Sequence, residues 1–321
     1  MRIPIVDLRE PDSEIAAAID EAARHVGFFQ IVGHGADRAI VDNAWNSAKR
    51  FFDLPGAAKL AVRIREGEAY GYAPYRSEAL AASLGETTPP DLKETFSVGP
   101  FGAAPAGLDD EAASFVHSPN RWPSEPADLE TAFEAYYETM AGLAARILSY
   151  MALALGLPQR YFDPFVDHHT SAIRALRYPD LGGMSPRSGQ LRAGAHTDYG
   201  TLTLLRQDNA PGGLEVRGVD GGWNPVPSVR EAFVVNIGDA LERWSNDRWR
   251  STLHRVAVPP HDSDRDSTRQ SLAFFHNANW DAAIECLPQC SDADHAPRYE
   301  PTTAGRHLME KFRRTQHTTV D

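Results

Sequence analysis

The chain has 321 residues, of which 42% are hydrophobic and 24% are charged, so it can form a large globular core and is not a disordered or fibrous chain. Its 32 Lys and Arg residues against 44 Asp and Glu residues give a formal net charge of −12, which disfavours nucleic acid and anionic membranes as partners. The 2 cysteines, Cys286 and Cys290, are too few for a disulfide framework, and we expect reduced thiols in a cytosolic protein.

No segment predicts export or membrane insertion. The N-terminus reaches Asp7 before any apolar run forms, so it does not resemble a signal peptide. The most apolar long stretch, residues 129–157, carries Glu130, Glu134 and Arg146, which a lipid-facing helix does not tolerate. We therefore expect a soluble, cytoplasmic protein that is a monomer or a weak homo-oligomer.

The first third of the chain mixes short strands and helices. Residues 3–6 predict a strand, and residues 12–26 predict a helix because their apolar side chains recur every three or four positions. A second strand is expected at 28–32 and a second helix at 37–52. Residues 67–127 are rich in Gly, Pro and Ser and show little periodicity, so we expect irregular loops that cover a site.

The rest of the chain predicts one long helix followed by a β-rich region. The helix extends from Leu129 to Leu155, with apolar residues along one face. Short β-rich runs separated by turn residues follow from about residue 171, at 172–178, 201–206, 213–217, 232–237, 254–258 and 271–276. Such spacing is typical of an antiparallel sandwich or barrel.

The segment Gly194–Gly200 contains a His-x-Asp pattern. On a strand, residues two apart point to the same face, so His196 and Asp198 could offer an imidazole and a carboxylate to one ion. Two histidines and one carboxylate on one face bind Fe(II) in non-haem oxygenases and leave positions for substrate and oxygen. With 12 histidines in the chain, one His-x-Asp match is weak evidence. The best second histidine is His254, at the start of a predicted strand, although a core histidine is the alternative.

Arg269 and Ser271 open the last apolar run at the same spacing of two. An arginine and a hydroxyl on one strand face can hold a carboxylate, because the guanidinium donates in a bidentate manner. An exposed arginine at a strand end is the simpler interpretation. A similar pattern at residues 265–267 lies in an acidic loop with no strand after it, so Arg269 is the preferred candidate.

Together these residues resemble the isopenicillin N synthase-like family of Fe(II)- and 2-oxoglutarate-dependent oxygenases. The resemblance covers nearly the whole chain and includes the opening segment 3–8, the D-x-K-E-x-F stretch at 91–96 and the segment 279–282. The His-x-Asp, the distal histidine and the Arg-x-Ser pattern occur in the family's order. None of these motifs is specific alone, but the combination is.

The resemblance implies an α+β chain with a double-stranded β-helix (jelly-roll) core and flanking helices. It implies Fe(II) held by His196, Asp198 and His254, and 2-oxoglutarate held by Arg269, Ser271 and Tyr178. With O2, this centre oxidises a C–H bond of a small-molecule substrate, with hydroxylation as the main expected outcome and succinate and CO2 as coproducts. A role in specialised-metabolite biosynthesis is an expectation of the same kind.

The expected division of the chain has four parts: an N-terminal region with site-covering loops at 1–127, a support helix at 128–170, the β-helix core at 171–290 and a C-terminal helix or tail at 291–321. Two departures from the family's N-Y-Y-P pattern, Leu176 for the asparagine and residues 180–181 for the following Pro-Cys, favour a bacterial type of member.

Other functions stay open at this stage. An Fe(II) oxidase on the same scaffold could catalyse cyclisation or desaturation without 2-oxoglutarate, and a non-catalytic β-barrel binding module could retain the motif. A zinc hydrolase is disfavoured because the chain has no HExxH pattern. Weaker candidates for the substrate pocket are Arg174, Tyr199, Phe275 and Tyr70, whereas His276 is expected at the surface.

Overall fold

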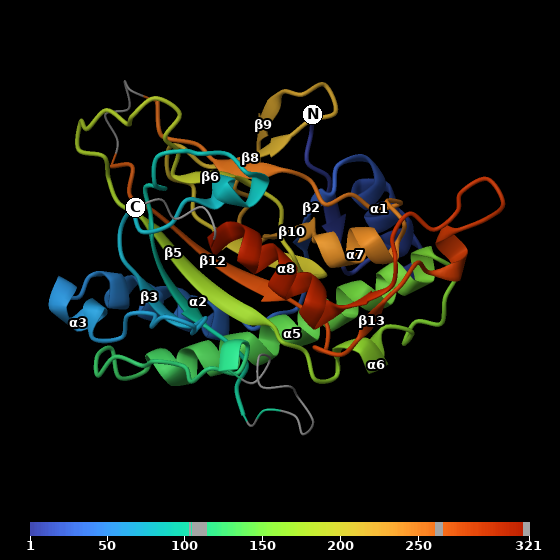
Figure 1. The fold of residues 1–321 in the computed structure, drawn as a ribbon, viewed down its shortest axis with the longest axis horizontal. Helices are drawn as coiled ribbons and strands as arrows, with labels where there is room; N and C mark the ends of the chain where they lie inside the picture. Colours follow the sequence, from blue (N-terminus) through green and yellow to red (C-terminus); the bar gives the residue numbers. More distant parts are fainter. Residues whose placement is uncertain (103, 105–113, 261–265, 317–321) are drawn as a thin grey trace.

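The computed structural model describes residues 1–102, 104, 114–260 and 266–316. Two β-sheets form its centre: an eight-stranded sheet with the order β1-β2-β10-β7-β12-β5-β4-β3 and a four-stranded sheet with the order β6-β11-β8-β9. Figure 1 shows helices on one side of the large sheet and the small sheet on the other. The fold therefore has a helical layer and two sheet layers, and the cavity described below lies between the sheets.

The strands of the large sheet are β1 (Ile5–Asp7), β2 (Phe28–Val32), β3 (Gly71–Ala73), β4 (Glu94–Val98), β5 (Ala172–Tyr178), β7 (Leu202–Gln207), β10 (Phe233–Ile237) and β12 (Arg269–His276). Those of the small sheet are β6 (Ala193–His196), β8 (Leu214–Arg217), β9 (Trp223–Pro225) and β11 (His254–Val256). A separate pair consists of β13 (Ala283–Ile284) and β14 (Thr302–Thr303). All pairings are antiparallel except that of β1 with β2.

The helices are α1 (Asp12–His25), α2 (Arg38–Phe52), α3 (Gly56–Leu60), α5 (Leu129–Ala154), α6 (Asp163–Val166), α7 (Asp239–Trp244) and α8 (Ala304–Gln316), with short 3₁₀ turns η1 (Leu80–Leu84) and η2 (Pro288–Cys290). Helix α5 contacts α1, α2 and strands of the large sheet, so its apolar face joins the main core. Helix α8 crosses in front of the large sheet and packs against η1 (Figure 1).

The expectation of irregular structure throughout residues 67–127 was wrong in part, because this region contributes β3 and β4 to one edge of the large sheet. Every residue of β4 is buried, although residues 95–98 alternate polar and apolar side chains, so its polar side chains lie inside the protein together with its apolar ones. Its charged residue, Glu94, is buried with Lys59 at 2.7 Å, which offsets the cost of burying the carboxylate.

The placement of His276 at the surface was also wrong. Its side chain is 1% exposed, and its Nδ1 lies 2.7 Å from the hydroxyl of Thr201. Burial lowers the pKa of His276 to about 3, so the ring is neutral at physiological pH. A buried histidine with a hydrogen-bond partner explains why this polar residue can end a strand as apolar as β12.

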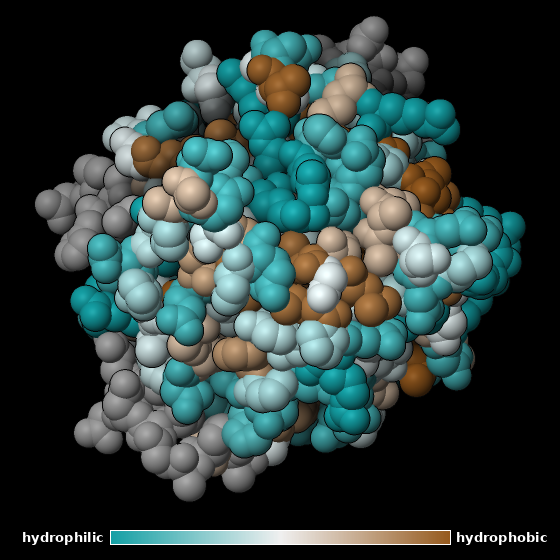
Figure 2. Space-filling view, turned by 90° about the vertical axis from the view of Figure 1, so that its right-hand side faces the viewer, coloured by the Kyte–Doolittle hydropathy of each residue, from teal (hydrophilic) through white to brown (hydrophobic). Residues whose placement is uncertain are grey.

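The surface agrees with the acidic, polar composition. Hydrophilic residues predominate on the face in Figure 2, and apolar residues occur there in separate groups. Among the residues that the structure describes, no helix has the length and apolar character that crossing a bilayer requires.

Helix α5 provides a direct test of the core. Phe133 is fully buried and contacts the aromatic rings of Phe96 and Trp122, so we expect Phe133→Ala to lower the free energy of unfolding by about 3–5 kcal/mol. The neighbouring Glu134 is exposed, and Glu134→Ala should change the free energy of unfolding by less than about 0.5 kcal/mol. Urea denaturation measures both values, and equal effects of the two substitutions would contradict the assigned helix face.

Candidate active site

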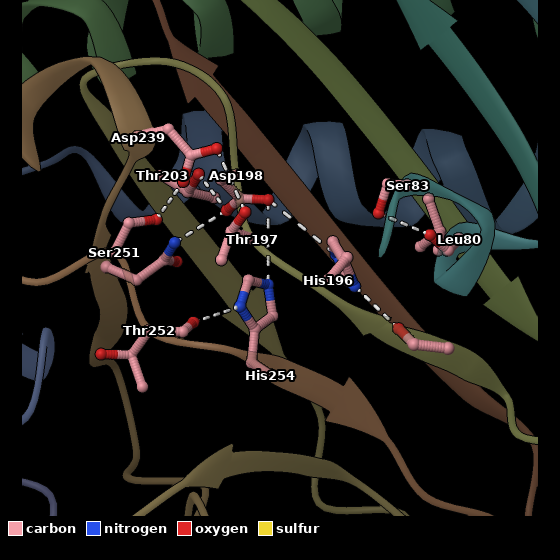
Figure 3. A network of polar contacts seen from close by, with 12 residues as sticks. Leu80, Ser83, His196, Thr197, Asp198, Thr203, Asp239, Ser251, Thr252 and His254 are labelled. Atoms are coloured by element: carbon pink, nitrogen blue, oxygen red, sulfur yellow. Dashed lines mark hydrogen bonds and ion pairs between the residues drawn. The ribbon is translucent and has the colours of Figure 1, made fainter. Parts of the chain in front are cut away.

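Three of the predicted residues converge at one end of the small sheet (Figure 3). His196 is the last residue of β6 and His254 the first residue of β11, and the two are partners in the strand register. Their ring centroids lie 4.3 Å apart. With Asp198 they form a group whose ligand atoms all lie within 4.8 Å of one another. This is the arrangement of two nitrogens and one oxygen that a single metal ion requires.

Asp198 is oriented by hydrogen bonds and not by strand alternation. The prediction that His196 and Asp198 share a strand was wrong, because β6 ends at His196. The Oδ2 atom of Asp198 accepts hydrogen bonds from Thr203 Oγ1 at 2.5 Å and from Asn236 Nδ2 at 2.7 Å. Its Oδ1 atom lies 3.9 and 3.8 Å from the Nε2 atoms of the two histidines. One carboxylate oxygen is therefore held by the protein, and the other faces the histidines.

The two histidines present the same ring nitrogen to the centre. The Nδ1 atom of His196 lies 2.8 Å from the carbonyl oxygen of Gly194, and that of His254 lies 3.1 Å from the carbonyl oxygen of Thr252. Because a carbonyl oxygen only accepts, each Nδ1 donates, and each Nε2 keeps its lone pair toward Asp198. This tautomer is the one that binds a metal ion through Nε2.

Burial sets the protonation of this group. Burial and the nearby His254 lower the pKa of His196 to about 3, so His196 is neutral at physiological pH. Burial alone would raise the pKa of Asp198, but the two histidines and the donors from Asn236 and Thr203 outweigh it and lower that pKa. An ionised carboxylate beside a neutral imidazole is the donor set that a divalent ion such as Fe(II) fits.

A second carboxylate, Asp239, ties the two ligand segments together. Its Oδ2 accepts a hydrogen bond from Thr197 at 3.1 Å, its Oδ1 accepts one from Ser251 at 2.5 Å, and its backbone N–H donates to the carbonyl of Asp198 at 2.8 Å (Figure 3). Lys311 of α8 forms an ion pair with it at 2.5 Å. Asp239 was not predicted, because no local pattern marks a residue that contacts three separate segments.

Arg269 lies at the start of β12, as predicted, and is buried. Its guanidinium lies 4.9 Å from the ring centroid of Tyr178, its register partner on β5, and 3.4 Å from the hydroxyl of Ser271. It donates to Gln207 at 3.0 Å, whereas the carboxylate of Asp208 lies at the 4.0 Å limit of an ion pair. This buried cation therefore retains the capacity to bind an anion that enters the cavity.

Arg192 is a second buried guanidinium near Arg269, and no local sequence pattern predicts it. It is fully buried and donates to the backbone carbonyls of Pro211 and Gly212 at 2.8 and 3.1 Å, and to that of Ser267. Burial and the charge of Arg269 lower the pKa of Arg192 to about 10. Arg192 thus adds a second positive charge near Arg269, with Asp208 and Asp180 as nearby negative charges.

A cavity of about 440 Å³ connects these groups. All of the predicted site residues line it: His196, Asp198, His254, Arg269, Ser271, Tyr178, Arg174, Tyr199, Phe275 and Tyr70. The hydroxyl of Tyr70 donates to the carbonyl of Val116 at 2.9 Å, and burial raises the pKa of Tyr70 above its usual value. Lining residues that were not predicted include Glu78 and, from α8, Leu308 and Phe312.

Comparisons with known proteins agree with this geometry. Residues 3–125 match the model described as the non-haem dioxygenase in morphine synthesis N-terminal family, and residues 161–278 match that of the 2OG-Fe(II) oxygenase superfamily. A 2-oxoglutarate-Fe(II) type oxidoreductase of Emericella nidulans is 35% identical over 298 residues, covering 91% of this chain and 82% of that protein. A homoarginine-6-hydroxylase of rice, Oryza sativa subsp. japonica, is 32% identical over 306 residues, covering 93% and 88%.

A solved structure shows the same likeness. A Neurospora crassa protein in complex with alpha-KG (2-oxoglutarate) superposes with a TM-score of 0.80 at 30% identity, over 96% of this chain and 95% of that one. The chain belongs to the 2OG-Fe(II) oxygenase superfamily. It is an Fe(II)- and 2-oxoglutarate-dependent dioxygenase that uses O2, and the expected α+β jelly-roll architecture is confirmed.

The hydrogen bond from Thr203 to Asp198 can be tested by Thr203→Val, which removes the hydroxyl and keeps the shape. We expect the affinity for Fe(II) to fall about 10- to 100-fold, as when other outer partners of metal ligands are lost. Calorimetric titration with Fe(II) under anaerobic conditions measures this affinity. Thr201→Val is the matched control, because that buried hydroxyl bonds to His276 and not to Asp198. Unchanged affinity in a folded Thr203→Val protein would contradict this role.

Glu242 in α7 should make stability depend on pH. Burial raises its pKa from 4.5 to about 7, and its Oε1 accepts a hydrogen bond from the Ser251 backbone at 2.7 Å. The unfolded chain loses this proton near pH 4.5 and the folded chain near pH 7, so the free energy of unfolding falls as pH rises between these values.

We therefore expect Glu242→Gln, which keeps the acceptor, to stabilise the protein at about pH 8 more than at about pH 5. Denaturation at both pH values measures this difference, with the exposed Glu134→Gln as control. The same pH dependence in Glu242→Gln and the wild type would show that another group is responsible.

Proposed function

We propose that His196, Asp198 and His254 bind Fe(II) through two Nε2 atoms and Oδ1, and that the protein hydroxylates a C–H bond of a small molecule. The observation that carries the assignment is the buried group of ligand atoms within 4.8 Å, in which Asp198 Oδ2 is already engaged by two donors. Among the described residues, no other group of three such side chains comes this close.

We also propose that Arg269, Ser271 and Tyr178 bind the distal carboxylate of 2-oxoglutarate. Arg269 is 1% exposed, and its nearest recorded carboxylate partner is at 4.0 Å, so an incoming carboxylate would find a buried cation with donors to spare. Ser271 lies on the same strand face, and Tyr178 faces Arg269 across the register of β5 and β12. The nearby charge of Arg192 favours an anion at the same end.

When bound, Fe(II), 2-oxoglutarate and O2 supply the oxidant that breaks the C–H bond, and succinate and CO2 are the coproducts. The chain's own residues bind and orient. Asp198 offsets part of the metal charge, and Arg269 offsets that of the cosubstrate. Apolar side chains, among them Phe275, Leu176 and Phe312, line the remaining cavity and exclude water from it.

We propose that Arg174, Tyr199, Phe275 and Tyr70 contact the substrate. Their support is that each lines the cavity that also contains the metal-binding group. Tyr70 presents its ring, because its hydroxyl is bound to Val116. The named activities of two relatives, a validamycin A dioxygenase and a homoarginine-6-hydroxylase, are compatible with a polar small molecule as substrate.

The test of this function is the response to 2-oxoglutarate. Anaerobic protein with Fe(II) should develop the visible charge-transfer band of the chelate on titration with 2-oxoglutarate, and Arg269→Gln should raise the required concentration about 100-fold, since a buried charge pair is lost. Arg177→Gln is the matched control, because this neighbour of Tyr178 forms an ion pair with Asp53.

Two results would contradict the proposal. If the charge-transfer band forms in Arg269→Gln at the same 2-oxoglutarate concentrations as in the wild type, Arg269 does not bind 2-oxoglutarate. A band that never forms in the wild type, although Fe(II) binds, would show that these residues do not form a 2-oxoglutarate site.

A further inference from the structure

Two oppositely charged side chains lie on the cavity wall without strong partners. Arg174, on β5, donates through Nε to Ser97 Oγ at 3.0 Å, and its Nη2 lies 3.5 Å from Glu78 Oε1. The other carboxylate oxygen of Glu78 lies 3.4 Å from Lys93 Nζ, is buried and has no hydrogen-bond partner among the described residues. Both ion pairs are longer than the 2.7–2.9 Å of a charge-assisted hydrogen bond.

The other charges near this wall are fully engaged. Lys93 lies 2.5 Å from Asp91, and Asp91 also accepts hydrogen bonds from the backbones of Leu80 and Gly194 at 3.1 and 2.9 Å. Glu68, the other glutamate that lines the cavity, is held by both donors of Arg121 at 2.7 Å each. Spare binding capacity is therefore concentrated at Arg174 and Glu78.

From this we infer that the substrate is a zwitterion, whose carboxylate binds Arg174 and whose ammonium binds Glu78. The inference rests on the proposed function, since it places the substrate in the same cavity as the Fe(II) and 2-oxoglutarate sites.

The charges of this wall are balanced: Arg174 and Lys93 are positive, and Glu78 and Asp91 are negative. A ligand with only a carboxylate would engage Arg174 and leave Glu78 with one weak partner, and a ligand with only an ammonium would do the reverse. Either outcome leaves a half-buried charge on the cavity wall poorly paired, which disfavours such a ligand. A zwitterion replaces one long ion pair with two short charge-assisted ones and keeps the balance.

The cavity lining also includes the apolar side chains of Leu80, Phe115, Leu176 and Phe275. Such a surface suits a hydrocarbon chain that extends from the charged head group into the cavity. We therefore expect an α-amino acid, or a molecule with the same paired charges, whose carbon chain bears the C–H bond that is oxidised.

The test uses three probes with matched carbon chains: L-norleucine, which carries both charges, hexanoate, which lacks the ammonium, and pentylamine, which lacks the carboxylate. Each is titrated into anaerobic holoenzyme with Fe(II) and 2-oxoglutarate, and binding is read from the change in the visible band. L-norleucine should bind at least about 10-fold more tightly than either of the other two.

Substitutions of Glu78 and Arg174 test whether these two residues cause the preference for L-norleucine. In Glu78→Gln, L-norleucine should bind no more tightly than hexanoate. In Arg174→Gln, it should bind no more tightly than pentylamine. In both variants the visible band with 2-oxoglutarate alone should be unchanged, which shows that the Fe(II) and 2-oxoglutarate sites are intact. Glu68→Gln is the matched control, because Glu68 lines the cavity but is already bound to Arg121, so the preference should persist.

Hexanoate or pentylamine binding as tightly as L-norleucine would overturn the inference, as would a failure of all three to change the band at millimolar concentration. So would a preference that survives both Glu78→Gln and Arg174→Gln. Absence of the band with 2-oxoglutarate alone would instead overturn the proposed function, so the two failures are distinguishable.

Discussion

The arrangement of the site follows from one constraint: the buried carboxylate of Asp198 must be paired with hydrogen-bond donors and a cation. Asp198 is 6% exposed, and an ionised carboxylate in such a place requires donors and a cation. The donors are Thr203 and Asn236, which are partners in the register of β7 and β10. On the opposite sheet, His196 and His254 are partners in the register of β6 and β11. The metal-binding group is therefore positioned by two cross-strand pairs, one from each sheet, and a slip of one residue in either sheet would separate it.

Pairing between strands also positions the proposed 2-oxoglutarate site. Arg269 and Tyr178 are register partners on β12 and β5, so the cation and the aromatic ring meet as a result of sheet pairing. Asp239 then links the segments that lie outside the strands: it joins Thr197 to Ser251, and Lys311 brings the C-terminal helix to the same point. Fold and site are thus coupled through hydrogen bonds, because the partners of Asp198 lie on two paired strands and Asp239 links the segments outside the strands.

Sequence patterns predicted the residues that lie at strand ends within short motifs. Arg269 and Ser271 were selected by their spacing of two, and His254 by its position at the start of a predicted strand. The structure brings Asp198 beside both histidines, but hydrogen bonds orient its carboxylate and strand alternation does not. Asn236 is marked by the sequence itself, because it is a polar residue inside the otherwise apolar strand Phe233–Ile237. Residues such as Arg192, Asp239 and Glu78 could not be predicted, because their partners come from strands and loops far away in the sequence. Strand β4 was not predicted, because its alternating residues 95–98 form a short run within a stretch rich in Gly, Pro and Ser.

The two ends of the cavity differ in charge, and this difference supports the proposed placement of cosubstrate and substrate at opposite ends. At the Arg269 end, the carboxylate nearest to the Arg269 guanidinium among the described residues is that of Asp208, at 4.0 Å, so this cation can pair with an incoming anion. At the other end, the long ion pair of Arg174 with Glu78 leaves no net charge but two unsatisfied partners. A dicarboxylate gains more at the first end, and a molecule with both charges gains more at the second. Under the proposed assignment, the cosubstrate therefore prefers the Arg269 end and the substrate the Arg174 end, because each ligand would leave a charged side chain poorly paired in the place of the other.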